Sequence, residues 1–316
     1  MVVSAPRTKT PAMLPSTPFT KAEVFDLGIR NRGWRSLVSE DLVREVYPGY
    51  FVDAALPDTV QLRLAIASRI LTPDLVVARR TAAWLHGLDL LDHRGFPRTP
   101  PLEVVTRRQQ LRSKSPLLTT HVADDLLSAD VMEVDGLLVT TPMRTAADLA
   151  RFAPRADALV SLDAFLHDGR VSPEAFRKSL IRWRRRRGIR QAYEIADLAD
   201  GRSQSGGESR LRLRVIDMGL PPPQLQVPVY DLFGEVRFWL DLGWRNWMLA
   251  LEYDGEEFHG PEQEAHDKRR RTWIEQRGWI VKAFRKEHIF TTSHTFEREV
   301  DLLVQQARGR GVTLGA

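Results

Sequence analysis

The sequence contains no cysteine. This absence excludes disulfide bonds, thiolate zinc sites and cysteine nucleophiles, although by itself it says little about the redox compartment. Three further signatures are missing: the Walker phosphate loop, the glycine pattern of dinucleotide-binding turns and the G-x-S-x-G nucleophile elbow. Nothing in the chain therefore indicates a nucleotide-driven enzyme, a dinucleotide-dependent enzyme or a serine hydrolase.

Long apolar runs are absent as well. No stretch approaches the ~20 consecutive apolar residues that a membrane-spanning helix requires. The first 19 residues contain four prolines and lack the continuous apolar segment of a signal peptide. We therefore expect residues 1–19 to form a disordered lead-in, and we expect a cytoplasmic protein that does not interact with membranes.

The remaining composition is that of an ordinary globular protein. With 43% hydrophobic and 28% charged residues, the chain can bury a sizeable core without disulfide bonds. Its length of 316 residues favours two or three domains. The net charge of +5 and the isoelectric point near 9.7 favour an anionic partner, of which nucleic acid is the commonest.

Residues 20–55 are predicted to fold as a winged helix-turn-helix. Thr20 is a suitable N-cap for a first helix that Gly28 would end, and a second helix opens at Asn31. Two short apolar strands then form a hairpin, over residues 42–47 and 50–52.

The second helix of such a motif enters the major groove of DNA. We expect contacts to phosphates or base edges of double-stranded DNA from Arg32, Arg35 and Arg44. Under the alternative interpretation, residues 20–55 form a small helical cap whose arginines lie on a solvated basic face.

Residues 56–198 are predicted to form an α+β region without a catalytic constellation. Apolar residues at helical spacing cover residues 58–91. Strands are expected over residues 102–105, 117–121, 131–134 and 137–141, and helices over 143–152, 155–167 and from 173. His86 and His121 are interpreted as structural histidines.

Three segments of this N-terminal part carry a family resemblance: VYPGYFV at residues 46–52, RRTAAWLHGLDLL at residues 79–91 and VDGLLVTTPMRTAADLA at residues 134–150. Over roughly residues 20–180, the chain resembles the abortive-infection type of antitoxin found in toxin–antitoxin systems. The resemblance implies a cognate toxin as a partner, but these motifs carry no chemistry.

Six arginines fall within nine residues, from Arg182 to Arg190. Such a density of charge repels itself unless anions screen it. We expect a surface that follows phosphates, with Arg184 and Arg185 among its DNA contacts, and the alternative is a solvated helix face. The small, polar and glycine-rich residues 199–207 are predicted to be the linker to a last domain over residues 208–316.

Two strands of this last domain are otherwise rich in Trp, Leu, Phe and Ala, and each contains a carboxylate, Asp241 or Glu252. Buried carboxylates are costly unless a cation meets them. A divalent metal ion, Mg²⁺ or Mn²⁺, is the simplest partner. Beside so much Arg and Lys, such an ion suggests cleavage of a phosphate backbone.

The surrounding pattern predicts the order helix, three strands, helix, strand. Ser205 and Glu208 have the spacing of a capping box, so the first helix would start there and end at Gly219. The later elements are expected over residues 227–232, 236–242, 247–253, 263–277 and 279–284, with Gly278 ending the second helix.

At this point the chain resembles the PD-(D/E)XK nuclease superfamily, and in particular the domains similar to very-short-patch-repair endonucleases. The matching segments lie within residues 203–290 and read GESRLR, RFWLDLGW, LALEYDGEEFH, DKRRRTW and RGWIVKAFRKEHI. The resemblance implies a restriction-endonuclease-like α/β domain in which Asp241 and Glu252 hold the catalytic metal. It further implies that Glu208 assists and that His259 transfers protons.

One position departs from the superfamily pattern. The lysine that the superfamily carries two residues after the second acid is Asp254 in this chain. In the repair-endonuclease-like branch this lysine is commonly missing, and a downstream histidine is thought to substitute for it.

The spacing of the two acids raises a geometric problem. A tight turn over Gly243–Asn246 would place Asp241 opposite Met248, four residues from Glu252. At ~3.3 Å per residue the acids would lie ~13 Å apart, too far to share one metal ion. The strands would then have to bend, or the loop would have to be wider than a tight turn.

The basic helix after these strands contains Lys268 and Arg270, which we expect to contact phosphates of DNA. A zinc hydrolase built on His259, His266 and Asp267 is an alternative, but the H-E-x-x-H spacing is absent.

The sequence therefore predicts a mixed α/β protein with an N-terminal winged helix, an α+β middle region and a C-terminal restriction-endonuclease-like α/β domain. The predicted function is a Mg²⁺-dependent endonuclease that hydrolyses phosphodiester bonds of DNA in defence or repair. The alternative is a DNA-binding transcriptional regulator or antitoxin with a catalytically inactive nuclease-like domain. The joint presence of Asp241, Glu252 and His259 favours the enzyme, because an inactive domain has no need of all three.

Overall fold

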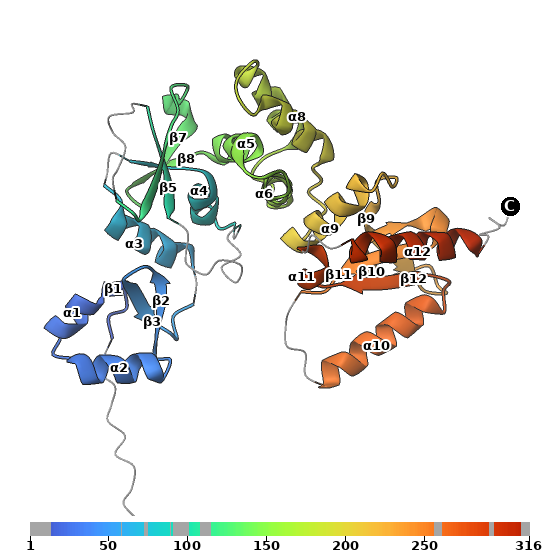
Figure 1. Cartoon of the computed structure of the whole chain (residues 1–316), viewed down its shortest axis with the longest axis horizontal. Coiled ribbons are helices and arrows are strands. Elements are labelled where there is room, and N and C mark those ends of the chain that lie inside the picture. The colour runs from blue at the N-terminus through green and yellow to red at the C-terminus, as the bar shows by residue number, and fades with distance from the viewer. Residues whose placement is uncertain are drawn as a thin grey trace, which may run out of the picture. The chain divides into compact units, whose positions relative to one another are not determined.

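In a computed structural model the protein has a mixed α/β fold, 48% helical and 22% strand, which confirms the predicted fold class. The structure describes residues 14–57, 59–72, 75–88, 90, 101–107, 115–255, 261–290 and 294–310. The chain divides into two compact units, residues 1–145 and residues 146–316 (Figure 1).

The first unit contains the two predicted short helices and the hairpin that follows them. They are preceded by a short strand that was not predicted, in which Phe19, assigned to the disordered lead-in, is buried. The elements are β1 (Phe19–Thr20), α1 (Lys21–Asp26), α2 (Asn31–Ser39), β2 (Val43–Tyr47) and β3 (Tyr50–Asp53), with strand order β1-β3-β2. Thr20 and Glu23 form a capping box at the start of α1, and Gly28 follows its end with φ +89°. Trp34 of α2 meets Phe51 edge to face, with ring centroids 4.8 Å apart, so the second helix is fixed on the hairpin.

A second sheet in this unit has the strand order β6-β5-β4-β8-β7. The elements are α3 (Val60–Ile70), β4 (Val76–Val77), α4 (Arg79–Leu85), β5 (Leu102–Thr106), β6 (Leu118–Val122), η3 (Ser128–Asp130), β7 (Val131–Val134) and β8 (Leu137–Thr140). The helical prediction over residues 58–91 is wrong at Val76 and Val77, which form the central strand. Val77 is fully buried between Val104 and Val139, and these long-range pairings override the helical pattern.

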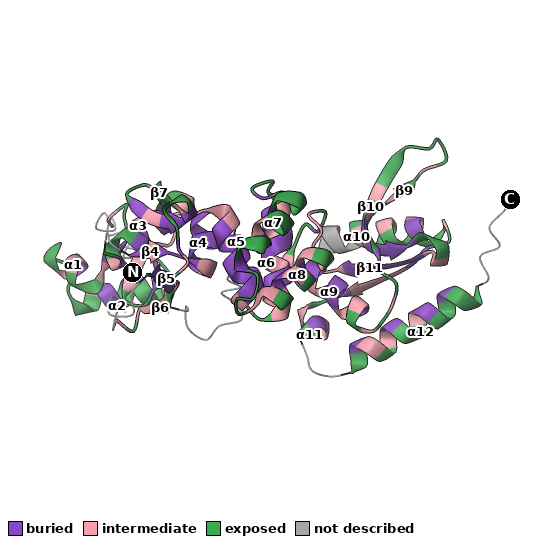
Figure 2. Cartoon of the chain, turned by 90° about the horizontal axis from the view of Figure 1, so that it is seen from above, coloured by how far each residue is buried: buried purple, intermediate pink, exposed green. Residues whose placement is uncertain are grey.

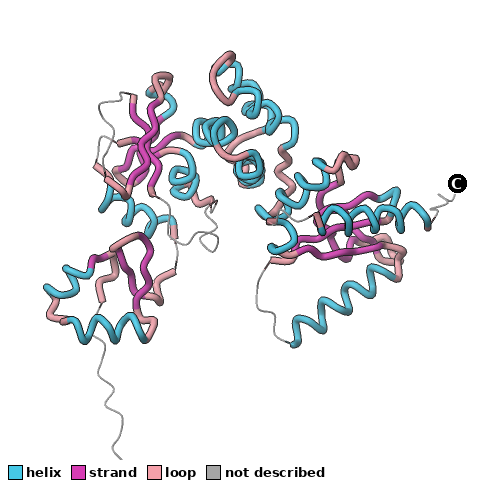
Figure 3. Tube along the Cα trace, in the orientation of Figure 1, coloured by secondary structure: helices cyan, strands magenta, loops and turns pink. Residues whose placement is uncertain are grey.

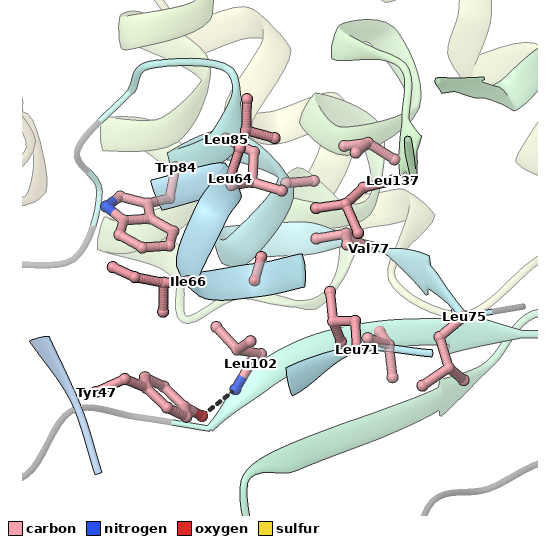
Figure 4. Packing of buried hydrophobic residues seen from close by; sticks show 14 of the residues in the cluster. Tyr47, Leu64, Ile66, Leu71, Leu75, Val77, Trp84, Leu85, Leu102 and Leu137 are labelled. Carbon is pink, nitrogen blue, oxygen red and sulfur yellow. Dashed lines mark hydrogen bonds between the residues drawn. The ribbon is translucent and has the colours of Figure 1, made fainter. Parts of the chain in front are cut away.

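Figure 4 shows the apolar core of this part, in which side chains from the hairpin, the two helices and the sheet pack together. The Tyr47 hydroxyl donates to the Leu117 carbonyl oxygen (2.6 Å) and accepts from the Leu102 N–H (2.8 Å). His86 is buried, with Nε2 2.8 Å from the Thr140 carbonyl oxygen. This contact agrees with the interpretation of His86 as a structural histidine.

Helices make up the chain from Pro142 to Leu198, and the first of them spans the division between the units. They are α5 (Pro142–Phe152), α6 (Arg155–His167), α7 (Pro173–Ser179), η4 (Leu180–Trp183) and α8 (Ile189–Leu198). The helices predicted over residues 143–152, 155–167 and from 173 are confirmed. Ser172 caps α7, and Pro173 is its first residue. The backbone N–H of a first helical residue makes no hydrogen bond within the helix, so proline, which has no N–H, is tolerated there.

The C-terminal part of the second unit has the predicted order of helix, three strands, helix and strand. Its elements are α9 (Gly206–Asp217), β9 (Gln224–Tyr230), β10 (Val236–Trp244), η5 (Arg245–Trp247), β11 (Leu249–Tyr253), α10 (Pro261–Glu275), β12 (Ile280–Phe284), α11 (Lys286–Ile289) and α12 (Thr295–Gly309). The sheet order is β12-β11-β10-β9, and the parallel strands β11 and β12 are joined through α10 (Figure 3). One apolar cluster joins α9 and α12 to the sheet, and a second one joins α10 to it.

Helix α12 is absent from the sequence prediction. Its buried side chains are Phe296, Val300, Val304 and Ala307, which recur at helical spacing and complete the cluster that includes α9. Figure 2 shows buried and exposed positions alternating along this helix. Within the described residues, no helix combines the length and the apolar character that crossing a membrane requires.

Residues 199–207, the predicted linker, pack within the second unit. The Asp200 N–H donates to Asp163 Oδ1 on α6 (2.8 Å), and Ser203 is buried. From α9, Arg212 forms an ion pair of 2.6 Å with the same Asp163, and both side chains are buried. Polar contacts thus connect α6 to α9 across this segment, and the domain boundary predicted there stays a prediction.

Candidate carboxylate site and DNA interface

Asp241 and Glu252 lie close together on neighbouring antiparallel strands. β10 and β11 pair Leu242 with Leu251, and the two acids are the next residues beyond this last pair. The charge of Glu252 acts on the titration of Asp241, so the two carboxylates are near one another. The Tyr253 N–H also donates to Asp241 Oδ2 at 2.9 Å. The two carboxylates therefore share one site.

A tight turn over Gly243–Asn246, the case that would have kept the two acids apart, is not what the structure shows. β10 continues to Trp244, and the chain turns over residues 245–248 with Met248 at φ +48°. Trp244 is buried, and its indole N–H donates to the Pro221 carbonyl oxygen at 2.7 Å. β10 therefore runs two residues past its predicted end at Leu242, and the register that follows brings Asp241 and Glu252 together.

Glu208 approaches this pair from the first turn of α9. The Ser205 hydroxyl accepts from the Glu208 N–H at 3.1 Å, which confirms the predicted N-cap. The carboxylate of Glu208 is buried and accepts from the Gln204 N–H (3.0 Å) and from Gln226 Nε2 (3.3 Å). These bonds hold it near enough to Asp241 to influence the titration of that residue.

Burial, together with the negative charges of Glu208 and Glu252, raises the pKa of Asp241 to about 7. The Tyr253 N–H and the charge of Arg270 act in the opposite direction but do not cancel the increase. Carboxylates this close repel one another when all are ionised. The cluster therefore binds a proton or a cation more readily than an isolated acid does.

Arg270 forms an ion pair with the buried Glu252. The guanidinium donates to both carboxylate oxygens, from Nη2 to Oε1 at 2.6 Å and from Nη1 to Oε2 at 3.1 Å. Nη2 also donates to the Trp239 carbonyl oxygen at 2.9 Å. Bidentate pairs between arginine and a carboxylate are among the strongest charge-assisted hydrogen bonds. The predicted DNA contact of Arg270 stays a prediction, but in this structure its guanidinium is engaged within the protein.

Asp254, at the position of the superfamily lysine, is paired away from the other acids. Its Oδ2 accepts from Arg285 Nε at 3.0 Å, and its N–H donates to the Phe284 carbonyl oxygen at 2.9 Å. The position therefore supplies no positive charge to Asp241 or Glu252. His259, predicted to transfer protons, lies outside the described residues.

The donor set of Asp241 and Glu252 consists of negatively charged oxygens, which Mg²⁺ and Mn²⁺ prefer. In the part of the chain that the structure describes, no group of three or more His, Asp or Glu side chains is arranged to hold a metal ion. A metal ion here would have Asp241 and Glu252 as protein ligands, with water completing its shell. Because Arg270 engages both oxygens of Glu252, the pair fits a metal ion only after this guanidinium moves.

The second helix of the N-terminal motif presents arginines to solvent. Arg32 and Arg35 are exposed, whereas Trp34 between them is buried. Arg44 differs, because it is half-buried on β2 and its Nη2 donates to the Leu56 carbonyl oxygen at 2.9 Å. Arg44 thus holds the hairpin to the segment that follows it, and the DNA contacts of all three arginines stay predictions.

The middle of the arginine run forms a loop, whereas Arg182 belongs to η4 and Arg190 to α8. Residues 184–188 turn between η4 and α8, with Arg185 at φ +67° and Gly188 at φ +80°. A Cβ on Gly188 would lie 2.2 Å from the Arg151 carbonyl oxygen, and Arg151 Nε donates to a carbonyl oxygen of the loop at 3.2 Å. The loop is therefore fixed on α5, and Arg184 and Arg185 remain exposed.

The charges of α10 do not all face the same way. Lys268, Arg269 and Arg271 are exposed, whereas Arg270 faces the sheet one turn before the fully buried Ile274. Residues four apart lie on the same face of a helix. The spacing of Arg270 and Ile274 is thus a signal in the sequence for the inward arginine, which charge content alone does not reveal.

Residues 75–200 match the family model of the AbiEi antitoxin C-terminal domain. The match covers the chain from just before β4 to the end of α8, and it confirms the antitoxin resemblance for that part. The nuclease-like segment, which starts at residue 203, lies outside this match.

Two uncharacterized proteins, from two strains of Mycobacterium tuberculosis, are similar to most of the chain. Each is 33% identical over 259 residues, which cover 81% of this chain and 87% of the relative. The chain belongs to the family of these mycobacterial proteins. A similarity of this length extends beyond residue 200 wherever it starts, so the family shares more than the antitoxin domain.

Proposed function

We propose that the protein is a DNA-binding regulator of the antitoxin kind. The observation that carries this proposal is the match of residues 75–200 to the AbiEi antitoxin domain, downstream of a helix–helix–hairpin motif with exposed arginines. This function is the alternative that the sequence left open. It takes precedence over DNA cleavage because the family match concerns the antitoxin part.

In this proposal α2 is the recognition helix. Its buried Trp34 and Leu37 anchor it on the hairpin, so that Arg32 and Arg35 point toward phosphates or base edges of the major groove. The hairpin β2–β3 is the wing. Most of the affinity of such an interface comes from phosphate contacts, which makes it strongly dependent on salt.

The loop over residues 184–188 is the proposed second DNA contact. Arg184 and Arg185 are exposed there, and the anchoring of the loop on α5 limits the entropy lost when it meets a phosphate backbone. The matched domain is named for an antitoxin, so the proposed protein partner is a toxin.

Binding of labelled duplex DNA to the full chain, measured by fluorescence anisotropy at several salt concentrations, tests the proposal. Wild type should bind, and its affinity should fall steeply with salt. The double substitution Arg32→Gln and Arg35→Gln should weaken binding, whereas Arg298→Gln, at an exposed site on α12, should not. Equal affinities for all three proteins would contradict α2 as the recognition helix.

A second candidate is Mg²⁺-dependent DNA cleavage, favoured by the acidic cluster in which the charges of Glu208 and Glu252 act on Asp241. In this proposal these acids hold Mg²⁺ or Mn²⁺, which when bound polarises a phosphate and lowers the pKa of a water ligand. Glu208 completes the acidic cluster and Lys268 contacts backbone phosphates. His259 exchanges a proton, as the resemblance to repair endonucleases implies.

Incubation of supercoiled plasmid with the full chain and either metal ion separates the two candidates. Nicking or linearisation that Glu252→Gln abolishes supports the nuclease, because that change removes a ligand charge while keeping the size of the side chain. Duplex binding without cleavage in Mg²⁺ or Mn²⁺ supports the regulator.

A further inference from the structure

The guanidinium of Arg270 lies where a metal ion would have to meet Glu252. It engages both carboxylate oxygens of Glu252, at 2.6 and 3.1 Å. We propose that Arg270 is an internal cation that excludes a divalent metal ion from Asp241 and Glu252, and that a DNA phosphate draws it away and opens the site. The displacement step rests on the proposed DNA binding.

Arg270 and a metal ion exclude each other by charge and by geometry. A divalent ion on this pair needs an oxygen of Glu252 at ~2.0–2.1 Å for Mg²⁺. With both oxygens already accepting from the guanidinium, a dication would lie a few ångströms from a positive charge, where repulsion in a partly buried site is strong. Occupation by one cation therefore weakens occupation by the other.

Arg270 is anchored at its backbone but can move at its tip. The buried Ile274 holds the same face of α10 against the sheet. The Arg270 side chain is 27% exposed, so solvent and ions reach it. It would give up the Trp239 carbonyl oxygen and a cation–π contact with Phe238, 5.5 Å from the guanidinium carbon to the ring centroid. Both contacts are available again when the arginine returns.

A phosphate is the anion best suited to take Arg270 from Glu252. The guanidinium fork matches phosphate oxygens as well as carboxylate oxygens. Lys268, Arg269 and Arg271 are exposed on the same helix and would bring a phosphate backbone close to Arg270. When DNA binds along α10, Arg270 would thus exchange the Glu252 carboxylate for a DNA phosphate.

The consequence is a reciprocal coupling between DNA and metal. If duplex DNA removes Arg270 from Glu252, it raises the affinity for a divalent ion, and the ion must raise the affinity for DNA by the same factor. Without Arg270, the metal site would be open from the start and the coupling would be lost.

Isothermal titration of Mn²⁺ into the full chain, with and without a short duplex, tests the proposal. Without DNA, Arg270→Gln should bind Mn²⁺ about tenfold more tightly than wild type, within the usual range of coupling factors. The duplex should tighten Mn²⁺ binding by wild type to a similar extent and leave Arg270→Gln nearly unchanged. Arg269→Gln is the matched control for loss of one charge on α10 and should behave as wild type. Adding Asp241→Asn to Arg270→Gln should abolish the gain.

Two outcomes overturn the proposal. One is folded Arg270→Gln protein, with a circular dichroism spectrum like that of wild type, that binds Mn²⁺ no more tightly than wild type does. The other is a duplex that binds wild type without changing its Mn²⁺ affinity, a measurement that needs no variant. A duplex that fails to bind wild type at all contradicts the proposed function and the displacement by DNA together. In that case the Mn²⁺ affinities of Arg270→Gln and wild type, measured without DNA, still test whether Arg270 excludes the metal ion.

Discussion

Gly207 and Tyr253 lie in such close contact that a Cβ on the glycine would come within 2.0 Å of the tyrosine ring. Gly207 belongs to the first turn of α9, and Tyr253 is the last residue of β11. Their contact lets the start of the helix rest on the strand that carries Glu252. The same approach positions Glu208, the next residue along the helix, beside Asp241.

Replacing Gly207 by alanine is expected to lower the free energy of unfolding by about 1–3 kcal/mol, the usual cost of forcing extra atoms into a packed site. Urea unfolding of the full chain measures this change. Gly309→Ala is the control, because a Cβ there would meet nothing within 4 Å and alanine favours helices. If both variants unfold at the same urea concentration as wild type, the contact with Tyr253 does not constrain α9.

Replacing Asp241 by asparagine is expected to stabilise the metal-free protein at alkaline pH. The pKa of Asp241 is about 7 in the folded protein, against an ordinary value of 3.8. The folded state therefore binds this proton more tightly than the unfolded state, and the stability of wild type falls as the pH rises from about 4 to about 7. Above about pH 7 the loss is complete, and it is on the order of 2 kcal/mol or more.

Urea unfolding in the presence of a chelator, at several pH values between about 4 and 8, checks the prediction for Asp241. The difference in stability between Asp241→Asn and wild type should grow across this window and then level off. A difference that is constant with pH would show that Asp241 ionises normally.

Replacing Arg212 by methionine is expected to cost about 3–5 kcal/mol, because it leaves the buried Asp163 without its cation. Burial already raises the pKa of Asp163 even with Arg212 present. Arg210→Met is the matched control: Arg210 pairs with Asp157 at a partly exposed site, where an ion pair contributes less than about 1 kcal/mol. Thermal or urea unfolding compares the variants, and equal losses would contradict the special role of the buried pair.

Neutralising Arg32 and Arg35 together is expected to reduce the salt dependence of duplex binding. Each phosphate contact contributes about 0.9 to the slope of the logarithm of affinity against the logarithm of salt concentration. The slope should therefore become shallower by about 1–2, with weaker binding to all duplex sequences if the contacts are to phosphates. Loss of preference for one sequence, with an unchanged slope, would instead assign these arginines to base edges.

Local signals in the sequence predicted several helix ends correctly. Thr20 and Ser205 cap their helices, and Gly28 and Gly278 follow helix ends with positive φ, as expected. These predictions work because the chemistry of a cap or a stop is contained in a few adjacent residues. The missed helix α12 also has a readable pattern, in the helical spacing of its buried residues.

Long-range pairing explains what the sequence did not reveal. The two-residue strand β4 has no periodicity of its own and exists because Val77 fits between β5 and β8. The identities of Asp241 and Glu252 were evident, but their register depends on Met248 adopting a left-handed conformation and on Trp244 being buried. Neither condition follows from residue spacing, so the spacing alone left the geometry of the two acids open.

The ion pair between Arg212 and Asp163 limits how this chain can be cut. The antitoxin match ends at residue 200, which would be a natural place to truncate a gene for expression. A polypeptide ending there keeps Asp163 on α6 but loses Arg212 on α9. The surface of α6 that α9 covers would then be exposed to water or to another copy of the chain. The shortest fragment that retains the pair within a complete α9 ends at Asp217. A transplant of the antitoxin domain into another protein must therefore include that helix or supply a new base for Asp163.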